Sequence, residues 1–340
     1  MSRLQLELDC DQGYFPIQDE IFPGESGQGY VLRMAAGNGL GGIACVKRML
    51  GCSRFQTLYA RDAPQLALWF GASVQRLAYA MESVPGGRRV EGSTYMGHIL
   101  GRSYFVNRSH PRVCPDCVRE LGYCRAAWDF ALSVACARHQ RLLIDRCPAC
   151  SSSLKWTRPN LCLCDCAHPW SSLDFCAPAT DSELLVAQII DRRMDDRVHV
   201  EKSISLCHQE IRSEMRALWL IMEGLSMDGV CRLLFAFATA ACYETDALAE
   251  RRQRAVMSKA RQTISMGIAM GIKLTQQKPI CLRTSPSVLI NLLKECGAKS
   301  LATAFDISIA QSLLGTFSLR KGHVAVSGSR GASMSQLVLF

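Results

Sequence analysis

Hydrophobic residues recur with helical spacing along most of this chain, and clusters of turn residues divide the pattern into short segments. Tyr30 and Met34 lie on one face of an expected helix over residues 26–36, and a Gly-Asn-Gly sequence after it is a stop signal. A second helix is expected over residues 42–50, with Val46 on its apolar face. These segments predict a helical N-terminal region.

Residues 63–77 have the pattern of a helix-turn-helix unit. Pro64 suits the first turn of a helix, Gly71 suits a tight turn, and Ser73 suits the N-cap of a following helix. The side chains that this second helix would bury are Val74, Leu77 and Ala78. Those that it would expose are Gln75, Arg76 and Tyr79. Three such side chains are few for reading a DNA groove, so docking of a protein or a structural role is favoured over base recognition.

Helical periodicity continues beyond Leu173. The periodic segments lie near residues 181–194, 204–225, 228–243, 247–270 and 286–296. Residues 301–314 then repeat the helix-turn-helix pattern, with Ser308 as the expected cap of a helix that buries Ala310 and Leu313. The predicted fold class is therefore mainly α, with a helix-turn-helix unit near each end.

The amino-acid composition is that of a globular protein. The chain has 340 residues, enough for two domains, with 49% hydrophobic and 20% charged residues. Its most apolar stretches, such as residues 230–242, are too short and too interrupted to cross a bilayer. The first residues include acidic ones and lack the apolar run of a signal peptide. We therefore expect a cytoplasmic protein with no membrane partner.

The formal net charge of +9 is unevenly distributed. Residues 1–100 carry nine basic and nine acidic side chains, residues 101–170 carry ten and five, and residues 251–283 carry eight basic and no acidic ones. A segment of one sign is either a solvated face or a contact for an anionic partner such as nucleic acid. The candidate residues for contact with nucleic acid or a partner are Gln75, Arg76, Arg251, Arg252, Arg254, Lys259 and Arg261.

The eighteen cysteines are the most informative residues of the chain, because many of them cluster with the spacing of metal ligands. Cys114-Pro-Asp-Cys117 is followed by Cys136-Ala-Arg-His139. Two ligands separated by two residues form a tight knuckle, and two knuckles close a tetrahedral shell of sulfur and nitrogen. Disulfides are a poorer interpretation in a chain of this length without an export signal. The spacing therefore predicts a structural zinc ion on three thiolates and one imidazole.

A second site is expected directly after the first. Cys147-Pro-Ala-Cys150 supplies one knuckle, and two of the next three cysteines complete an all-cysteine site of zinc-ribbon type. We favour Cys164 and Cys166 for this role, with Cys162 as the alternative. Four protein ligands leave no position open for water, so both predicted ions, two Zn²⁺ per chain, are structural rather than catalytic.

The pattern divides the chain into four expected parts. Residues 1–100 form an N-terminal helical region, residues 101–175 a module with two zinc sites, and residues 176–325 a C-terminal helical domain. Residues 326–340 form a tail rich in serine and glycine, which we expect to be flexible.

These motifs resemble the TniQ family of transposition proteins. The resemblance lies in the Cys114 to Cys150 knuckles, with Tyr123 and Trp128 between them, and in the opening Glu25-Ser26 that precedes Arg33 and Asn38-Gly39. It covers residues 20–173, and the C-terminal half matches only through its expected second helix-turn-helix. Ser151 and Ala167 depart from the family pattern, which usually has glycine after the knuckles of the second site.

The resemblance implies a non-catalytic targeting adaptor of a Tn7-like transposon. TniQ-like proteins help to choose the insertion site, some by binding a DNA attachment site and others by joining an RNA-guided Cascade complex with its crRNA, often as homodimers. They recruit an AAA+ ATPase regulator, which in turn brings the transposase. Composition and spacing by themselves indicate none of these partners.

Two other classes of function are weighed against this one. An enzyme is disfavoured because the sequence has no Walker loop, no acidic cluster for two-metal chemistry, and no His-x-Glu motif followed by the Cys-x-x-Cys of zinc deaminases. The alternative function is a stand-alone zinc-containing helix-turn-helix transcription regulator. Such a regulator would need base contacts from a recognition helix and a strong preference for one DNA sequence.

Overall fold

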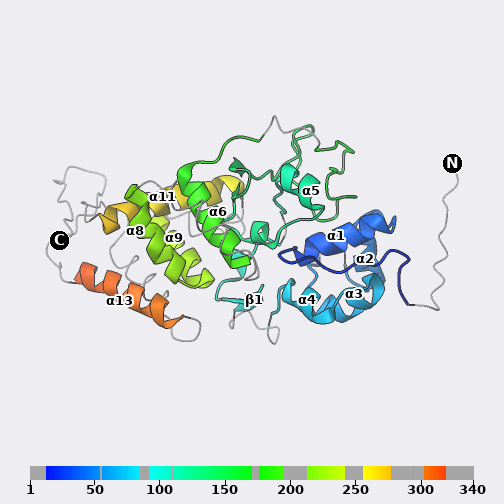
Figure 1. Ribbon diagram of the computed structural model, residues 1–340, viewed down its shortest axis with the longest axis horizontal. Coiled ribbons are helices and arrows are strands. Elements are labelled where there is room, and N and C mark those ends of the chain that lie inside the picture. The colour runs from blue at the N-terminus through cyan, green and yellow to red at the C-terminus, as the bar shows by residue number, and fades with distance from the viewer. Residues whose placement is uncertain are drawn as a thin grey trace.

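The protein is represented by a computed structural model that describes residues 13–53, 56–84, 92–108, 110–170, 176–194, 213–241, 256–276, 294 and 302–318. Its helices are α1 (Gly27–Gly37), α2 (Ile43–Met49), α3 (Ala63–Phe70), α4 (Val74–Tyr79), α5 (Pro115–Leu121), α6 (Asp181–Met194), α8 (Ser213–Gly224), α9 (Met227–Ala241), α11 (Met257–Thr275) and α13 (Ala304–Ser318). Helices α1 to α4 lie at one end of the molecule and α8 to α13 at the other (Figure 1). The predicted mainly α class is confirmed.

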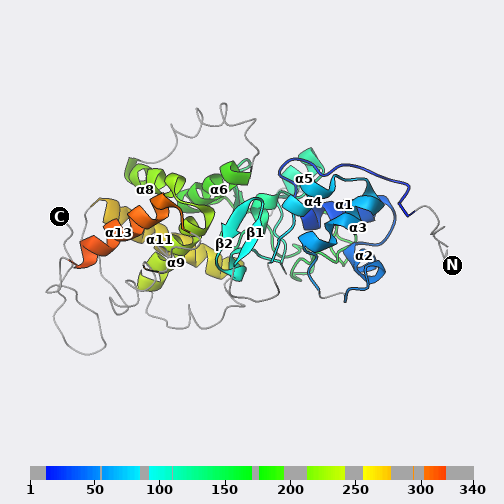
Figure 2. The same ribbon diagram turned by 90° about the horizontal axis from the view of Figure 1, so that it is seen from below.

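Little of the described chain is extended. The antiparallel pairs are β1 (Ser93–Tyr95) with β2 (His98–Leu100) and β3 (Ala135–Cys136) with β4 (Arg141–Leu142). Short 3₁₀ turns are η1 (Ala60–Asp62), η3 (Ser103–Phe105) and η4 (Ala126–Asp129). Figure 2 shows β1 and β2 between the two helical ends. Residues 83–109, which contain this hairpin, are rich in glycine, serine and arginine and show no alternation of apolar and polar positions, because strands of three residues are too short to display a period.

The N-terminal helix-turn-helix unit forms as its caps predict. The Ser73 hydroxyl accepts a hydrogen bond from the backbone N–H of Arg76 and starts α4, while Gly71 ends α3 with a φ of 80°. The burial pattern on α4 is partly wrong, because Val74 is 38% exposed. Leu77 is buried with Ala80 just beyond the helix, so the inward face starts one turn later than expected.

The first helix explains the opening motif of the chain. Ser26 caps α1, and Glu25 is fully buried and accepts two hydrogen bonds from Arg33, which lies eight residues later in α1. The Asn38 side chain both donates to and accepts from the backbone of Ile17. These contacts hold the irregular segment before α1 against the helix. The residues of the opening motif therefore have a structural role within this part of the chain.

Four helices form the core of the C-terminal half. Helix α11 packs on α9, α8 and α6, and α9 packs on the β1–β2 hairpin. A Cβ at Gly267 would lie 2.9 Å from the carbonyl oxygen of Leu234, so glycine allows α11 to approach α9 closely. The predicted segment 181–194 coincides with α6, and 228–243 is close to α9. The segment 286–296 lies outside the described residues except for residue 294.

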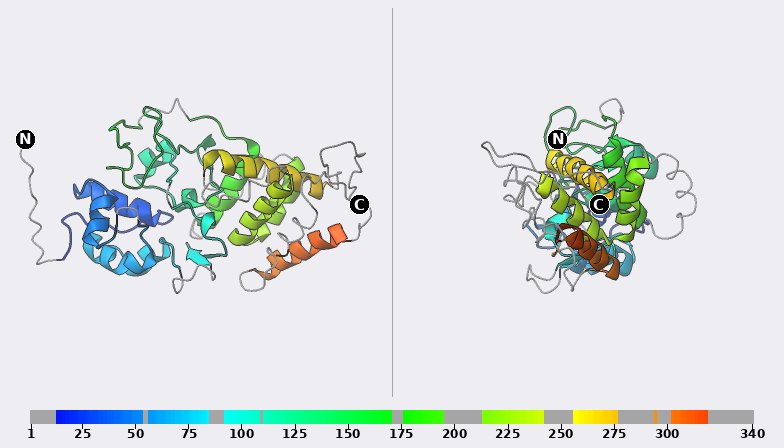
Figure 3. Two further views of the ribbon diagram at one scale, coloured as in Figure 1. Left: turned by 180° about the vertical axis from the view of Figure 1, so that it is seen from behind. Right: turned by 90° about the vertical axis from the view of Figure 1, so that its left-hand side faces the viewer.

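The prediction of a second helix-turn-helix over residues 301–314 is wrong. Residues 304–318 form one continuous helix, α13, and Ser308 lies inside it. The helix starts at Thr303, whose hydroxyl accepts a hydrogen bond from the N–H of Asp306 while the Asp306 carboxylate accepts one from the N–H of Thr303. This reciprocal cap outcompetes a turn before Ser308. Figure 3 shows α13 along the outside of the helical bundle.

Polar and aromatic contacts connect the central region to the C-terminal helices. Arg125 pairs with Asp191 at 2.7 Å, and the N–H of Gly101 donates to the Asp228 carboxylate at 2.7 Å. The rings of Phe105 and Phe235 stack with centroids 5.8 Å apart. The expected domain limits at residues 100 and 175 stay predictions. No helix in the described ranges is long and apolar enough to cross a membrane.

Candidate metal centres

The first predicted group of ligands comes together around α5 and the β3–β4 pair. Cys114 is the N-cap residue of α5, Cys117 lies in its first turn, and Cys136 ends β3. The ligand atoms of these three residues and of His139 all lie within 4.8 Å of one another. The three cysteines are buried, so this group is closed to solvent on most sides.

The distances in this group suit one tetrahedral ion. His139 Nδ1 lies 3.4 Å from the Sγ of Cys114 and 3.2 Å from that of Cys117, and the Sγ atoms of Cys117 and Cys136 are 3.5 Å apart. A disulfide would need about 2.05 Å. Zinc with Zn–S bonds of about 2.3 Å and Zn–N bonds of about 2.0 Å sets edges of about 3.5–3.8 Å. The separations therefore match the edges of a metal shell.

A carboxylate outside the shell orients the imidazole. Glu120 Oε1 lies 3.1 Å from Nε2 of His139, and Arg138 pairs with the other carboxylate oxygen at 2.8 Å. This contact fixes the ring so that Nδ1 faces the thiolates, an arrangement common around metal-bound histidines. The sequence pattern named His139 but gave no signal for Glu120, because its role depends on α5 lying beside the β3–β4 turn.

The second group is built from the next two knuckles. Its ligand atoms, from Cys147, Cys150, Cys164 and Cys166, also lie within 4.8 Å of one another. The Sγ atoms of Cys147 and Cys166 are 3.8 Å apart, and those of Cys150 and Cys164 are 3.7 Å apart. Cys162 is outside this group, so the favoured ligands, rather than the alternative, are the ones that meet.

The donor chemistry of both groups fits a metal ion. Thiolate and imidazole sets of this kind, with tetrahedral spacing and no fifth protein donor in the group, are those of structural zinc sites. Both groups could therefore bind a metal ion. They differ in exposure, because all three cysteines of the first group are buried, whereas Cys150 and Cys166 are exposed.

The turns after the second-site knuckles are left-handed despite their lack of glycine. Ser151 has a φ of 57° and Ala167 a φ of 62°. Residues with a Cβ occupy this region at a cost of about 1–2 kcal/mol. The tight turns of the family pattern are therefore retained at these two positions, with some backbone strain.

Replacing Ala167 by glycine is expected to stabilise the protein by up to about 1 kcal/mol, because glycine adopts a positive φ without a Cβ clash. The control is Ala149→Gly in the other knuckle of the second group, at an exposed residue without a positive φ, which is expected to be neutral or destabilising by about 0.5 kcal/mol. Chemical denaturation of the metal-loaded protein measures both. Equal effects of the two substitutions would contradict this account.

The predicted basic residues are not brought together. Gln75 and Arg76 are exposed on α4, whereas Arg251, Arg252 and Arg254 lie outside the described residues. Lys259 is half-buried on α11. Arg261 forms an ion pair with Glu183 of α6, so its charge is neutralised within the fold. Among the described residues, α11 therefore offers less positive charge to a partner than the sequence suggested.

Sequence reasoning missed a buried carboxylate that joins the N-terminal helices to the first metal group. Asp129 Oδ2 accepts hydrogen bonds of 2.6 Å from the Ser26 and Tyr95 hydroxyls. Burial raises the pKa of Asp129 to about 6, although the two hydroxyl donors lower it. The segment that carries Asp129 lies between Cys117 and Cys136, so α1, β1 and the metal group share one polar core.

This pKa predicts a pH dependence. Folding raises the pKa of Asp129 from 3.8 to about 6, so the protonated carboxyl stabilises the folded state. This stabilisation is fully present below about pH 3.8 and is lost as the pH rises through about 6. Between about pH 5 and about pH 7.5 the loss is about 1.5 kcal/mol. Asp129→Asn keeps an acceptor for both hydroxyls and should remove this slope. Urea titrations at the two pH values measure it, and parallel profiles for both proteins would refute the assignment.

Comparison with known proteins gives one positive result. The model of the TniQ family, described as TniQ, matches residues 16–143. No curated protein matches the chain. The matched segment runs from the loop before α1 to β4, and so contains the helix-turn-helix unit, the Asp129 core and all four ligands of the first group. Residues 16–143 are therefore a TniQ domain.

Proposed function

We propose that this chain is a non-catalytic targeting adaptor of a Tn7-like transposon. It links recognition of the insertion site, on DNA or within a crRNA-guided Cascade complex, to an AAA+ ATPase regulator and through it to the transposase. The observation that carries this proposal is the TniQ match over residues 16–143. Action in the cytoplasm and assembly as a homodimer are parts of the same proposal.

Two structural zinc ions belong to this proposal. Each would be held by four protein ligands, the first ion by Cys114, Cys117, Cys136 and His139, and the second by Cys147, Cys150, Cys164 and Cys166. A shell closed by protein ligands leaves no position for substrate or water, so the ions stabilise loops rather than catalyse. The result is a rigid surface on which other macromolecules assemble.

Reconstitution with partners tests the adaptor role. The reading frames beside the gene are searched for a transposase, an AAA+ ATPase and CRISPR effectors, and the ATPase is purified. We expect the chain to form a complex with the ATPase in the presence of ATP, measured by size-exclusion chromatography with light scattering. A gene without transposition neighbours, together with no complex with an AAA+ regulator of a TniQ-containing transposon, would overturn the proposal.

DNA binding separates an adaptor from a transcription regulator. An adaptor alone is expected to bind random and site-containing duplexes weakly, with affinities that differ by less than about tenfold, whereas a specific regulator discriminates by about 10³ or more. Fluorescence anisotropy at fixed salt measures the ratio, because phosphate contacts make affinity depend on salt. Strong discrimination by the chain alone would support the regulator instead.

A further inference from the structure

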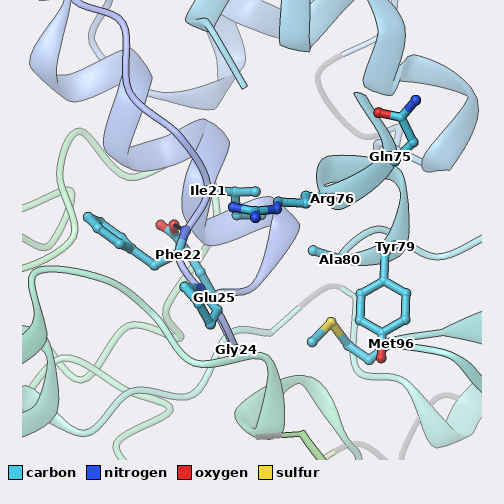
Figure 4. A pocket seen from close by; sticks show the side chains of 10 residues that line it. Ile21, Phe22, Gly24, Glu25, Gln75, Arg76, Tyr79, Ala80 and Met96 are labelled. Atoms are coloured by element: carbon cyan, nitrogen blue, oxygen red, sulfur yellow. Dashed lines mark hydrogen bonds between the residues drawn. The ribbon is translucent and has the colours of Figure 1, made fainter. Parts of the chain in front are cut away.

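A cavity of about 450 Å³ lies between the loop that precedes α1 and the helix α4. Its walls come from residues 21–25, from α4 and from the turn of the β1–β2 hairpin (Figure 4). This groove is separate from both cysteine groups. Its volume is within the range of sites that bind small molecules or single side chains of a partner, about 300–1,000 Å³.

The groove is mainly apolar and has aromatic rims. Phe22 and Tyr79 are 40% and 43% exposed, whereas Ile21 at the base is buried. The Phe22 ring stacks on Tyr123 with centroids 5.3 Å apart and carries the Arg33 guanidinium 4.5 Å from its centroid. Phe22 is therefore held in place by neighbours although it is exposed, as expected for a preformed contact surface rather than a loose loop.

The third wall contains a methionine in an uncommon conformation. Met96 has a φ of 49°, and the next residue, Gly97, has a φ of 74°, so the hairpin turn puts a bulky side chain where asparagine or glycine is usual. Met96 also donates its backbone N–H to the carbonyl oxygen of Tyr79. Strained positions that persist cluster at functional sites, and methionine adapts its shape to apolar ligands.

The lining of the groove offers one arginine, Arg76, to a ligand. The single carboxylate in the lining, Glu25, accepts hydrogen bonds from the Arg33 guanidinium and from the N–H of Phe22. Arg76 is exposed, its side chain extends toward Ile21 in Figure 4, and its guanidinium has no acidic partner among the described residues. A ligand that fills the groove therefore gains most if it combines an apolar group with a negative charge.

We propose that this groove binds a short acidic segment of a partner protein, with one aliphatic or aromatic side chain in the cavity and a neighbouring carboxylate on Arg76. A carboxylate matches the planar guanidinium with two parallel hydrogen bonds. The inference rests on the proposed adaptor function for the identity of the partner, while the groove itself can be tested without it. Nucleic acid is a poorer fit, because one arginine in a concave apolar wall provides few phosphate contacts.

Selection from random peptides tests the chemistry of the ligand. Phage carrying random twelve-residue peptides are selected on the full-length protein with metal bound. We expect enrichment of peptides in which Asp or Glu stands within two residues of Leu, Ile, Met, Phe or Trp. Replacing that apolar residue by serine in the synthetic peptide should weaken binding at least tenfold. Enrichment of basic peptides, or of none above background, would overturn the proposal.

Reversal of the charge at residue 76 tests whether Arg76 contacts the acidic group of the peptide. Arg76→Glu should weaken binding of the selected acidic peptide at least tenfold and should strengthen binding of its lysine-substituted counterpart. Arg48→Glu is the matched control, because Arg48 is also an exposed helical arginine but lies on α2, outside the groove, and it should leave both affinities unchanged. Equal effects of the two reversals would show that long-range charge alone explains the binding.

The position of the peptide is read from methionine methyl groups. In protein labelled with ¹³C-methyl methionine, the Met96 signal, assigned through Met96→Leu, should shift on titration with peptide, and that of Met49 on α2 should not. A Met96 shift caused by random duplex DNA but not by peptide would assign the groove to nucleic acid. If peptide binding is absent but the complex with the ATPase forms, the proposed peptide-binding role of the groove is refuted and the adaptor role stands.

Discussion

Replacing Cys117 by serine is expected to remove one zinc ion and to unfold the TniQ domain. Cys117 is fully buried, and its Sγ lies 3.5 Å or less from two other ligand atoms of the first group. Binding of a structural zinc ion contributes about 10–16 kcal/mol to small zinc domains. This is comparable to or larger than the whole stability of a domain, about 5–15 kcal/mol, so the remaining contacts cannot compensate.

Metal content and folding are measured together. Elemental analysis should find two zinc ions in the natural protein and one in Cys117→Ser, and circular dichroism should show loss of the cooperative thermal transition. Cys124→Ala is the matched control, because Cys124 is also buried but belongs to neither ligand group, and it should keep both ions. A Cys117→Ser protein with unchanged melting would remove the structural role of this site.

The second site should respond differently. Cys147→Ser is also expected to release one ion, but two of the ligands of that group are exposed, so fewer packed residues depend on it. The loss of structure should be confined to residues 147–170, measured by hydrogen exchange. The difference between the two variants follows from burial, because the first group lies in the shared core and the second at its edge.

Replacing Arg33 by alanine should destabilise the protein by about 3–5 kcal/mol. Two nitrogens of Arg33 donate to the two oxygens of Glu25, each at 2.9 Å, and Glu25 is fully buried. Burial already raises the pKa of Glu25 even with this partner present. Without Arg33 the carboxylate would lie in the core with only the N–H of Phe22, so the charged form would be strongly disfavoured.

A second substitution identifies the cause. Adding Glu25→Gln to Arg33→Ala removes the unpaired charge and should recover at least about 1 kcal/mol of the loss. Arg48→Ala, at an exposed helical arginine, should change stability by no more than about 0.5 kcal/mol. Urea denaturation measures all three. Equal destabilisation by Arg33→Ala and the double variant would show that lost packing on Phe22, not the buried charge, is responsible.

Local signals were sufficient for the elements whose ends are fixed by nearby residues. Ser73 caps α4 as expected, the helix expected from residue 26 begins there with Ser26 as its cap, and the eight favoured ligands meet in two groups. Caps and knuckles act over three or four residues, so the chain around them contains the whole of the relevant chemistry. The same locality explains the error at Ser308, where two equally local caps compete and Thr303 with Asp306 succeeds.

Asp306 shows why that competition could not be resolved in advance. Its other carboxylate oxygen accepts a hydrogen bond from the N–H of Ser226, eighty residues earlier in the chain, and Asp306 is buried. The start of α13 is therefore coupled to the N-terminal end of α9. A contact between distant segments has no sequence signature, because its strength depends on how the helices pack.

The amino-acid sequence by itself determined the helical class, the N-terminal helix-turn-helix and the two sets of candidate metal ligands, since spacing within a few residues defines each. Only the tertiary structure decided that Asp129 joins α1 to the first metal group, that Glu183 neutralises Arg261, and that an apolar groove opens beside Arg76. These features require residues from elements far apart in the chain to lie within hydrogen-bonding or van der Waals distance, which only folding brings about.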